Sequence, residues 1–196
     1  MNMKDLNDLI NNGVIIVNTQ GICIDDESTI ESGARIEEFC VIMGASVVKK
    51  GATIKSFSTV SDSIVGENTA VGPMAHLREH SIIGDNCKIG NFVEIKHSFL
   101  GNKTKAAHLA YIGDAYIGDN CNIGCGVIFC NYNGKIKNTT FVGNNCFIGS
   151  NSNLIAPISI GDNCFIAAAT TVTASLPSNS FIKGNRDNTI YENREK

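Results

Sequence analysis

The sequence predicts an all-β protein, a parallel β-helix built as a triangular prism, with a short N-terminal helix and an irregular C-terminal tail. The main observation is an aliphatic residue that returns every six residues for most of the chain. This period fits neither an amphipathic helix nor an isolated strand, but it fits a coil whose sides are short strands joined by turns. The aliphatic positions are Ile24, Ile30, Ile36, Ile42, Val48, Ile54 and Val60, then Val65, Val71, Leu77, Ile83, Ile89 and Ile95, then Ile112, Ile117 and Ile123, and finally Val142, Ile148, Leu154, Ile160, Ile166 and Val172.

A small residue four positions after the aliphatic one is the second observation. We expect both to point inward, and each buried aliphatic side chain contributes roughly 1.5–3 kcal/mol. Gly, Asp and Asn fill the turns, as at 84–86, 118–120 and 161–163, because they tolerate positive φ or bond their own backbone. Three sides of six residues close a coil of about eighteen. Known hexapeptide-repeat prisms wind left-handedly, against the usual right-handed rule, so we expect a left-handed coil. The small residues include Ser28, Ala34, Ser46, Ala52, Ser58, Thr69, Ala75 and Ser152.

The chain divides into three expected segments. Residues 1–19 form a capping helix and linker, with an amphipathic helix from Asp5 to Asn12 that places Leu6, Leu9 and Ile10 on one face. This helix would cover the apolar end of the prism. Residues 20–176 form the β-helix, and residues 177–196 form a polar tail that is either an extension or a strap onto a neighbouring subunit.

Composition favours one domain and excludes several partners. The net charge is −3 with both signs interspersed, so no basic stripe indicates nucleic-acid binding. The first ten residues lack the apolar core of a signal peptide, and no apolar run approaches the roughly 18 residues of a membrane span. We therefore expect a cytoplasmic protein without nucleic-acid or membrane partners.

The eight cysteines are explained mainly by the repeat. There is no CxxC pair, which makes a structural zinc site a poor interpretation. Cys130 is expected to be a buried thiol at a loop edge, although a nucleophile remains the alternative. Five cysteines fall on the small inward position, where Cys packs as a compact apolar residue, namely Cys40, Cys87, Cys121, Cys146 and Cys164.

Two interruptions of the repeat, Leu100 to Tyr111 and Cys130 to Phe141, are the expected places for function. The first brings His108 together with lysines, a carboxylate and a tyrosine. A neutral imidazole can accept a proton near pH 7, so His108 is a candidate base, although a lone surface His is the blander interpretation. Stacking of the coils would bring the polar groups of both interruptions together.

Several motifs make the sequence similar to a known family. NFVEIK, AAHLAYIGDA, NIGCGVIFCNYNGKIK, GPMAHLR and FIGSNSNLIAPISIGDNCFIAAATTVT resemble, in order and spacing, the acetyltransferase half of the bifunctional bacterial GlmU enzymes. The resemblance covers nearly the whole chain and implies an acetyl-CoA-dependent N-acetyltransferase acting on glucosamine 1-phosphate. No Gly-rich nucleotidyltransferase loop lies near the N-terminus, so we expect no uridyltransferase activity. Ala107, Ala110 and Asn133 depart from the residues that the family commonly has.

The resemblance also implies residue roles. His108 would be the general base, Glu94 would orient its imidazole, and the backbone amide of Cys125 would face the thioester oxyanion. Arg78, Lys96 and Lys137 would clamp the sugar phosphate, which requires cations. The remaining implied contacts are Tyr111, Asn122 and Asn131 for the sugar and Tyr132, Ser150, Ala168 and Arg186 for acetyl-CoA.

The implied reaction is a direct transfer without an acyl-enzyme and without a metal, in a homotrimer whose sites lie between neighbouring prisms. Cys130 would then not be a nucleophile. Three alternatives stay open: another amino-sugar phosphate or nucleotide-linked amino sugar as acceptor, a zinc-dependent γ-carbonic anhydrase type of site, and a non-catalytic trimeric scaffold. His76, His80 and His97 have no implied role and are expected to be surface residues.

Overall fold

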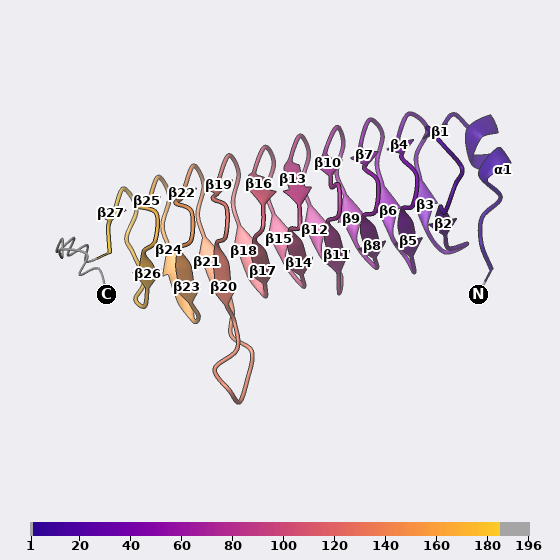
Figure 1. The fold of residues 1–196 in the computed structure, drawn as a ribbon. Coiled ribbons are helices and arrows are strands. Elements are labelled where there is room, and N and C mark those ends of the chain that lie inside the picture. The colour runs from indigo at the N-terminus through magenta and orange to yellow at the C-terminus, as the bar shows by residue number, and fades with distance from the viewer. Residues whose placement is uncertain (1, 185–196) are drawn as a thin grey trace, which may run out of the picture.

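The computed structural model describes residues 2–184. Helix α1 (Leu6–Asn11) is followed by short strands that form a left-handed parallel β-helix of about nine turns. The repeat predicts the parallel coil, whereas its hand was expected from known hexapeptide-repeat proteins. Figure 1 shows α1 at one end of the solenoid, with each coil stacked on the next toward the C-terminal end. Every neighbouring pair of strands is parallel, so each coil adds one strand to each of three faces.

Within residues 2–184 the three faces contain ten, nine and eight strands. Face 1 consists of β1 (Ile15–Ile16), β4 (Arg35–Ile36), β7 (Thr53–Ile54), β10 (Ala70–Val71), β13 (Lys88–Asn91), β16 (Lys105–His108), β19 (Asn122–Ile123), β22 (Phe147–Ile148), β25 (Phe165–Ile166) and β27 (Phe181–Ile182). Face 2 consists of β2 (Cys23–Ile24), β5 (Val41–Met43), β8 (Thr59–Ser61), β11 (His76–Arg78), β14 (Glu94–Lys96), β17 (Tyr111–Gly113), β20 (Ile128–Cys130), β23 (Asn153–Ile155) and β26 (Thr171–Val172). Face 3 consists of β3 (Thr29–Ile30), β6 (Val47–Val48), β9 (Ile64–Val65), β12 (Ile82–Ile83), β15 (Phe99–Leu100), β18 (Ala115–Ile117), β21 (Thr140–Val142) and β24 (Ile158–Ile160).

The core is a set of aliphatic columns inside the prism. On face 2, Leu77, Ile95 and Ile112 pair in register in successive coils, and all three are fully buried. The small inward residues are buried as predicted, and so are the five cysteines on the same repeat position. Burial of this stack is the main source of stability, because each coil has little apolar surface to bury except against its neighbours.

The expected interruption from Leu100 to Tyr111 is wrong. Strand β16 pairs in register with β13 and β19, with Ala106 between Ile89 and Ile123 at the inward position and fully buried. Lys88, Lys105 and Asn122 pair seventeen residues apart, so several coils are one residue shorter than the expected eighteen. The repeat was missed here because alanine replaces the larger aliphatic residue. His108 therefore projects from an uninterrupted coil.

The second interruption is real. Ile117 pairs with Val142, twenty-five residues later, so this coil contains an insertion. The insertion follows β20 and forms a loop that leaves the solenoid (Figure 1). An antiparallel bridge between Tyr132 and Lys137 closes the loop, and the Asn138 amide donates to the Asn131 carbonyl at its base. We call residues 131–139 the corner loop.

Both ends differ in detail from expectation. Leu9 is buried and Leu6 packs against the core, but Ile10 is 43% exposed, so its predicted place on the apolar face is wrong. Strand β1 already pairs with β4 inside the segment expected to be a linker. At the other end, β27 pairs with β25, so residues 181–182 continue the coil where the sequence indicated an irregular tail.

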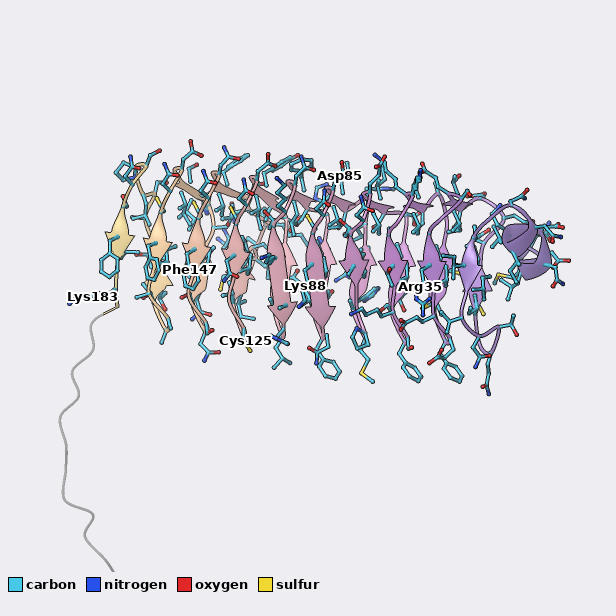
Figure 2. All side chains as sticks on the ribbon, turned by 90° about the horizontal axis from the view of Figure 1, so that it is seen from above. Arg35, Asp85, Lys88, Cys125, Phe147 and Lys183 are labelled. Carbon is cyan, nitrogen blue, oxygen red and sulfur yellow. The ribbon has the colours of Figure 1, made fainter. Side chains whose placement is uncertain are left out.

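A polar ladder runs along the corner between faces 3 and 1, where Figure 2 shows Asp85; Cys125 lies at the opposite edge of face 1. Each side chain in the ladder accepts a hydrogen bond from a backbone amide of the preceding coil. From Asp85 onward carboxylates alternate with neutral side chains, so within the ladder no two charges are stacked directly. The ladder consists of Asp85, Asn102, Asp119, Asn144, Asp162 and Ser178.

Replacing Asn144 by Asp should destabilise the solenoid by about 1 kcal/mol, because it inserts a third carboxylate between Asp119 and Asp162 and removes the amide bond to Asp162. The urea midpoint should fall at low ionic strength and partly recover in high salt, which screens like charges. Asn145→Asp is a matched control, because its side chain bonds Asn163 in a neighbouring column without carboxylates. Equal losses in the two variants at every salt concentration would show that charge alternation is not the reason.

Candidate active site

The corner between faces 1 and 2 carries a column of residues in successive coils. Strand register places Asn91 beside His108, and continues through the next coils to Cys125, Ser150 and Ala168. Backbone hydrogen bonds join this corner from coil to coil, from the Asn151 amide to the Cys125 carbonyl at 2.8 Å and from the Ala169 amide to the Ser150 carbonyl at 2.7 Å. We call this set the base column. It brings together His108, the expected base, Cys125, the expected oxyanion donor, and Ser150 and Ala168, two of the four expected coenzyme A contacts.

His108 is exposed at the end of β16, and its Nδ1 lies 2.9 Å from Oδ1 of Asn91. Because an amide oxygen only accepts, this contact favours the tautomer of the neutral ring that carries its hydrogen on Nδ1 and leaves the Nε2 lone pair free. A neutral imidazole held in this tautomer can accept a proton from a ligand. Sequence reasoning missed Asn91, although its position seventeen residues before His108 was available once the coil length was known.

Glu94 does not orient His108 in this structure, contrary to the expectation. The Glu94 carboxylate accepts from Nε of Arg78 at 2.8 Å and lies 2.6 Å from the second guanidinium nitrogen, whereas the side chain of His108 bonds Asn91. The difference follows from position. Glu94 begins β14 on face 2 and points along the same face as Arg78 on the neighbouring β11, whereas His108 ends a strand of face 1.

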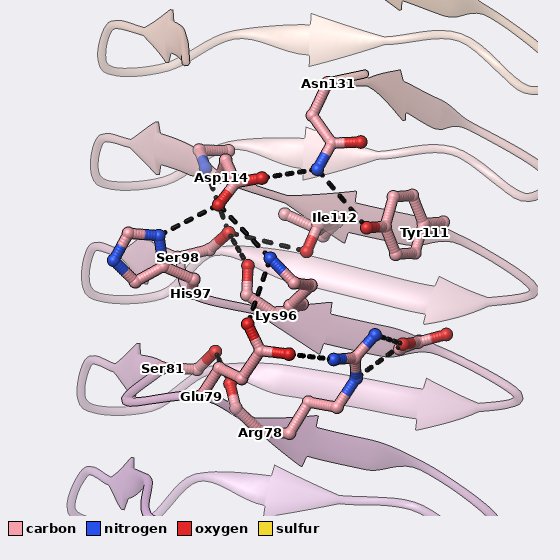
Figure 3. Close-up of polar contacts among 12 residues, drawn as sticks. Arg78, Glu79, Ser81, Lys96, His97, Ser98, Tyr111, Ile112, Asp114 and Asn131 are labelled. Carbon is pink, nitrogen blue, oxygen red and sulfur yellow. Dashed lines mark hydrogen bonds and ion pairs between the residues drawn. The ribbon is translucent and has the colours of Figure 1, made fainter. Parts of the chain in front are cut away.

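The corner between faces 2 and 3 carries a second group, the cationic corner, formed by Arg78, Lys96 and Lys137. Arg78 and Lys96 pair in register at the ends of β11 and β14. Lys137, from the corner loop, lines a pocket of about 560 Å³ together with Lys96, Glu79, His80, His97, Asp114 and Thr139. The regular coils therefore supply two cations to this surface, and the insertion supplies the third. Figure 3 shows the contacts around Arg78 and Lys96.

Asp114 is the buried centre of this group. Its carboxylate lies 3.3 Å from Nζ of Lys96 and 2.9 Å from Nδ1 of His97, and it accepts from the side-chain amide of Asn131 (Figure 3). Only 8% of Asp114 is exposed. Burial alone would raise the pKa of Asp114, but the hydrogen bonds from His97 and Asn131 and the charge of Lys96 outweigh it and hold that pKa below its ordinary value.

Lys96 is buried although it is charged, and only 5% of its side chain is exposed. Burial acts to lower its pKa, but the adjacent carboxylates of Glu79, at 3.1 Å, and Asp114 outweigh burial, and the pKa of Lys96 is raised. Lys96 is therefore a fixed ammonium at neutral pH, with its orientation set by the two carboxylates.

The structure brings some of the other expected residues to this corner and not others. Tyr111 and Asn131 meet, with the Asn131 amide 3.4 Å from the Tyr111 hydroxyl. Asn122 lies on face 1 beside Lys105, in a separate hollow of about 610 Å³. Tyr132 is 61% exposed on the corner loop. Arg186 lies outside the described residues.

Sequence reasoning missed three residues of this corner. Glu79, His97 and Asp114 occupy equivalent positions in successive coils, directly after β11, β14 and β17, and all three have positive φ, at 52°, 45° and 50°. His97, expected to be a plain surface residue, bonds Asp114. The signal that could have found them is their spacing of eighteen and then seventeen residues.

All eight cysteines are free thiols. Burial raises the pKa of Cys40 to about 11 and also raises the pKa of Cys130, which leaves both thiols protonated and poorly nucleophilic at neutral pH. Among residues 2–184, no group of three or more His, Cys, Asp or Glu side chains could hold a metal ion. No helix in that part of the chain is both long and apolar enough to cross a membrane.

The coil, its six-residue period and its three faces define a hexapeptide-repeat β-helix protein. Two family models match parts of the chain, and one of them is a hexapeptide repeat. One described as the GMPPB C-terminal domain matches residues 7–87, and one described as the hexapeptide repeat of succinyl-transferase matches residues 140–174.

Within this class, the sequence is similar to the acetyltransferase region of GlmU proteins. Bifunctional protein GlmU from Caldicellulosiruptor saccharolyticus is 58% identical over 91 residues, which cover 46% of this chain and 20% of that protein. GlmU from Acetivibrio thermocellus is 47% identical over 102 residues, 52% of this chain and 22% of that protein. The chain thus spans about a fifth of the length of the curated relatives that it matches.

Solved structures share the fold. The UDP-N-acetylglucosamine acyltransferase of Francisella novicida has a TM-score of 0.65 at 20% identity, over 87% of this chain and 67% of that one. LpxA from Acinetobacter baumannii has a TM-score of 0.63 at 19% identity, over 87% and 71%. A mutant perosamine N-acetyltransferase from Caulobacter crescentus, in complex with CoA and GDP-perosamine, has a TM-score of 0.53 at 21% identity, over 59% and 53%. At these identities the likeness establishes the fold alone.

Replacing Asp114 by Asn tests the buried centre. The variant keeps the size of the side chain but leaves Lys96 with one carboxylate, and the free energy of unfolding at neutral pH should fall by about 2 kcal/mol. Because the pKa of Asp114 is lowered in the folded protein, its stabilisation is complete above the ordinary Asp value of about 4 and is lost as the pH falls through the lowered value. The difference in urea midpoint between wild type and variant should therefore shrink below about pH 4. A difference that stays constant with pH would contradict the assigned charge.

Proposed function

We propose that the chain is an acetyl-CoA-dependent N-acetyltransferase that converts glucosamine 1-phosphate to N-acetylglucosamine 1-phosphate. The observation that carries the proposal is the cationic corner, where Arg78, Lys96 and Lys137 gather at one edge of face 2 while His108 stands at the other. The similarity to GlmU over about half of the chain supports the class of reaction.

The proposal places one small acceptor across face 2, between its two edges. From Glu94 to Lys96 the backbone of β14 advances about 7 Å, the dimension of a substituted sugar ring. In the proposed complex the acceptor phosphate binds the cationic corner, Tyr111 and Asn131 contact the sugar, and the amine faces Nε2 of His108.

In the proposed reaction His108 acts as the general base. The acceptor nitrogen attacks the carbonyl carbon of the acetyl thioester and forms the new C–N bond, and Nε2 takes the proton that the nitrogen loses. The amide of Cys125, next along the base column, donates to the developing oxyanion. Collapse of the intermediate breaks the C–S bond, and coenzyme A leaves as the thiol after receiving the proton from His108.

The acetyl donor is proposed to lie along the base column. Ser150 and Ala168 follow Cys125 in the next two coils, so an extended pantetheine would run along this edge toward the C-terminal end. Tyr132 would contact it from the corner loop. Arg186 is kept as a candidate contact from outside the described residues.

Asn122 gives a reason to propose a homotrimer. It lies on face 1 beside Lys105, away from the cationic corner of its own chain. If Asn122 contacts the same sugar as Tyr111 and Asn131, it must come from a neighbouring copy. The trimer is therefore proposed together with a site shared between subunits, in a cytoplasmic enzyme.

A nucleotide-linked amino sugar is the second candidate acceptor, and a specific observation favours it. The pocket at the cationic corner shares His80 and His97 with a smaller hollow of about 160 Å³, which Phe99 and Tyr116 line on face 3. A group attached beyond the phosphate could enter this hollow and stack on an aromatic ring.

The acceptor and the base are tested together by thiol release from acetyl-CoA with glucosamine 1-phosphate, galactosamine 1-phosphate and glucosamine 6-phosphate. Wild type should be fastest with the first, and His108→Ala should lower kcat by about 10²–10⁴-fold, the usual contribution of a general base. Near-wild-type activity in this variant would rule out His108 as the base. No activity with any of the three sugars would move the assignment to a nucleotide-linked acceptor or to a scaffold.

The role of Cys125 predicts a contrast between backbone and side chain. Cys125→Ala keeps the amide, so kcat should stay within about threefold of wild type, which corresponds to less than 1 kcal/mol. Cys130→Ala should behave alike, since direct transfer uses no thiol. Loss of activity in either variant, measured in the same thiol-release assay with the fold checked by circular dichroism, would indicate that the thiol takes part.

A further inference from the structure

Lys96 is bound by two carboxylates of different character. Asp114 is buried, with 9% of its side chain exposed, and it has three partners. Glu79 reaches Lys96 from the solvent side, and 49% of its side chain is exposed. The inner carboxylate is part of the folded structure, whereas the outer one can leave by rotation of its own side chain.

Glu79 also contacts Arg78, so its carboxylate connects the two paired cations of the cationic corner. One oxygen binds the Arg78 guanidinium, and the other lies 3.1 Å from Nζ of Lys96. Figure 3 shows the Glu79 carboxylate between the two side chains. An oxyanion that binds Arg78 and Lys96 together would place its oxygens where those of Glu79 now lie.

The charges lead to the same conclusion. In this corner Arg78, Lys96 and Lys137 supply three positive charges, and three carboxylates neutralise them, namely Glu79, Glu94 and Asp114. The hydrogen bond from Lys96 is the main cause that lowers the pKa of Glu79, and the charges of Arg78 and Lys137 act in the same direction. Glu79 is thus ionised, and an incoming phosphate meets a site that is already neutral.

We propose that the Glu79 carboxylate occupies the phosphate subsite in the free protein and that the phosphate of an acceptor must displace it. This competition lowers the affinity of the subsite for anions. The proposal rests on the proposed function in taking Arg78, Lys96 and Lys137 as the phosphate clamp. Competition of this kind weakens the binding of every anion by the same factor. Free inorganic phosphate then binds poorly, whereas an amino-sugar phosphate, with further contacts to its ring, stays bound.

Displacement needs no change of the coil. The Glu79 backbone is fixed at a corner with φ of 52°, and among the described residues its side chain forms ion pairs only with Arg78 and Lys96. Asp114 and Glu94 continue to hold Lys96 and Arg78 when Glu79 leaves. The two cations therefore stay in place for the ligand.

The test is calorimetric titration with inorganic phosphate at pH 8 and constant ionic strength, using the full chain. Glu79→Gln and Glu79→Ala should each bind phosphate about tenfold more tightly than wild type, a change of about 1.4 kcal/mol. Asp62→Asn is the matched control, because it removes one carboxylate at the same corner one coil earlier, and it should change the affinity less than about twofold, or 0.4 kcal/mol. Circular dichroism and urea midpoints show whether each variant folds.

The outcomes separate the inference from the proposed function. Unchanged or weaker phosphate binding in both Glu79 variants, or no measurable binding in any protein, overturns the inference, whether or not acetyl transfer is found. An equal gain in Asp62→Asn also overturns it, since general electrostatics would then explain the effect. Tighter binding in the Glu79 variants alone upholds it, even if no amino sugar is acetylated. A structure of wild type with phosphate should show the Glu79 carboxylate displaced from both cations.

Discussion

In-register stacking of parallel coils is the constraint on which the rest of this structure depends. Each residue lies beside the equivalent residue of the next coil, so each side chain contacts the side chains at the same position in the coils before and after it. For aliphatic side chains this builds the core. For charges it is unfavourable unless the sequence alternates, and the ladder from Asp85 to Ser178 does alternate carboxylates with neutral groups.

The cationic corner departs from that rule and is stabilised in another way. Arg78 and Lys96 are like charges in register, and Lys96 is almost fully buried. The corner is stable because carboxylates surround the cations: Glu94 holds Arg78, Asp114 holds Lys96, and Glu79 joins the two. A stacked pair of cations of which one is buried, unlike the exposed pair Lys88 and Lys105, indicates a site for an anion, with stability given up locally for binding.

The sequence predicted those features that depend on one residue's place in the repeat. The three faces, the buried small residues, the five buried cysteines and the loop after Cys130 all follow from period and residue size. The errors came where tertiary pairing decides. Ala106 fills a core position that a search for large aliphatics passes over. Glu94 bonds along its own face to Arg78 instead of across a corner to His108, and that choice depends on side-chain direction, which spacing alone does not contain. The places of Glu79 and Asp114 in the site could be recognised only once the strand register was known.

The corner loop shows how a solenoid acquires a site without losing its core. An insertion within a strand would shift every later inward residue to the wrong face, whereas an insertion at a corner lengthens a connection at small entropic cost. Here the coil resumes in register at Thr140, which pairs with Ala115, while the loop adds Lys137 to the pocket and places Asn131 on the Asp114 carboxylate. Asp114 thus joins the regular coil, through Lys96 and His97, to the inserted loop. The buried carboxylate of Asp114 therefore holds together the part of the site on the regular coils and the part on the inserted loop. Glu79 is exposed and is not needed for this connection, so in the proposal it is the carboxylate that a ligand displaces.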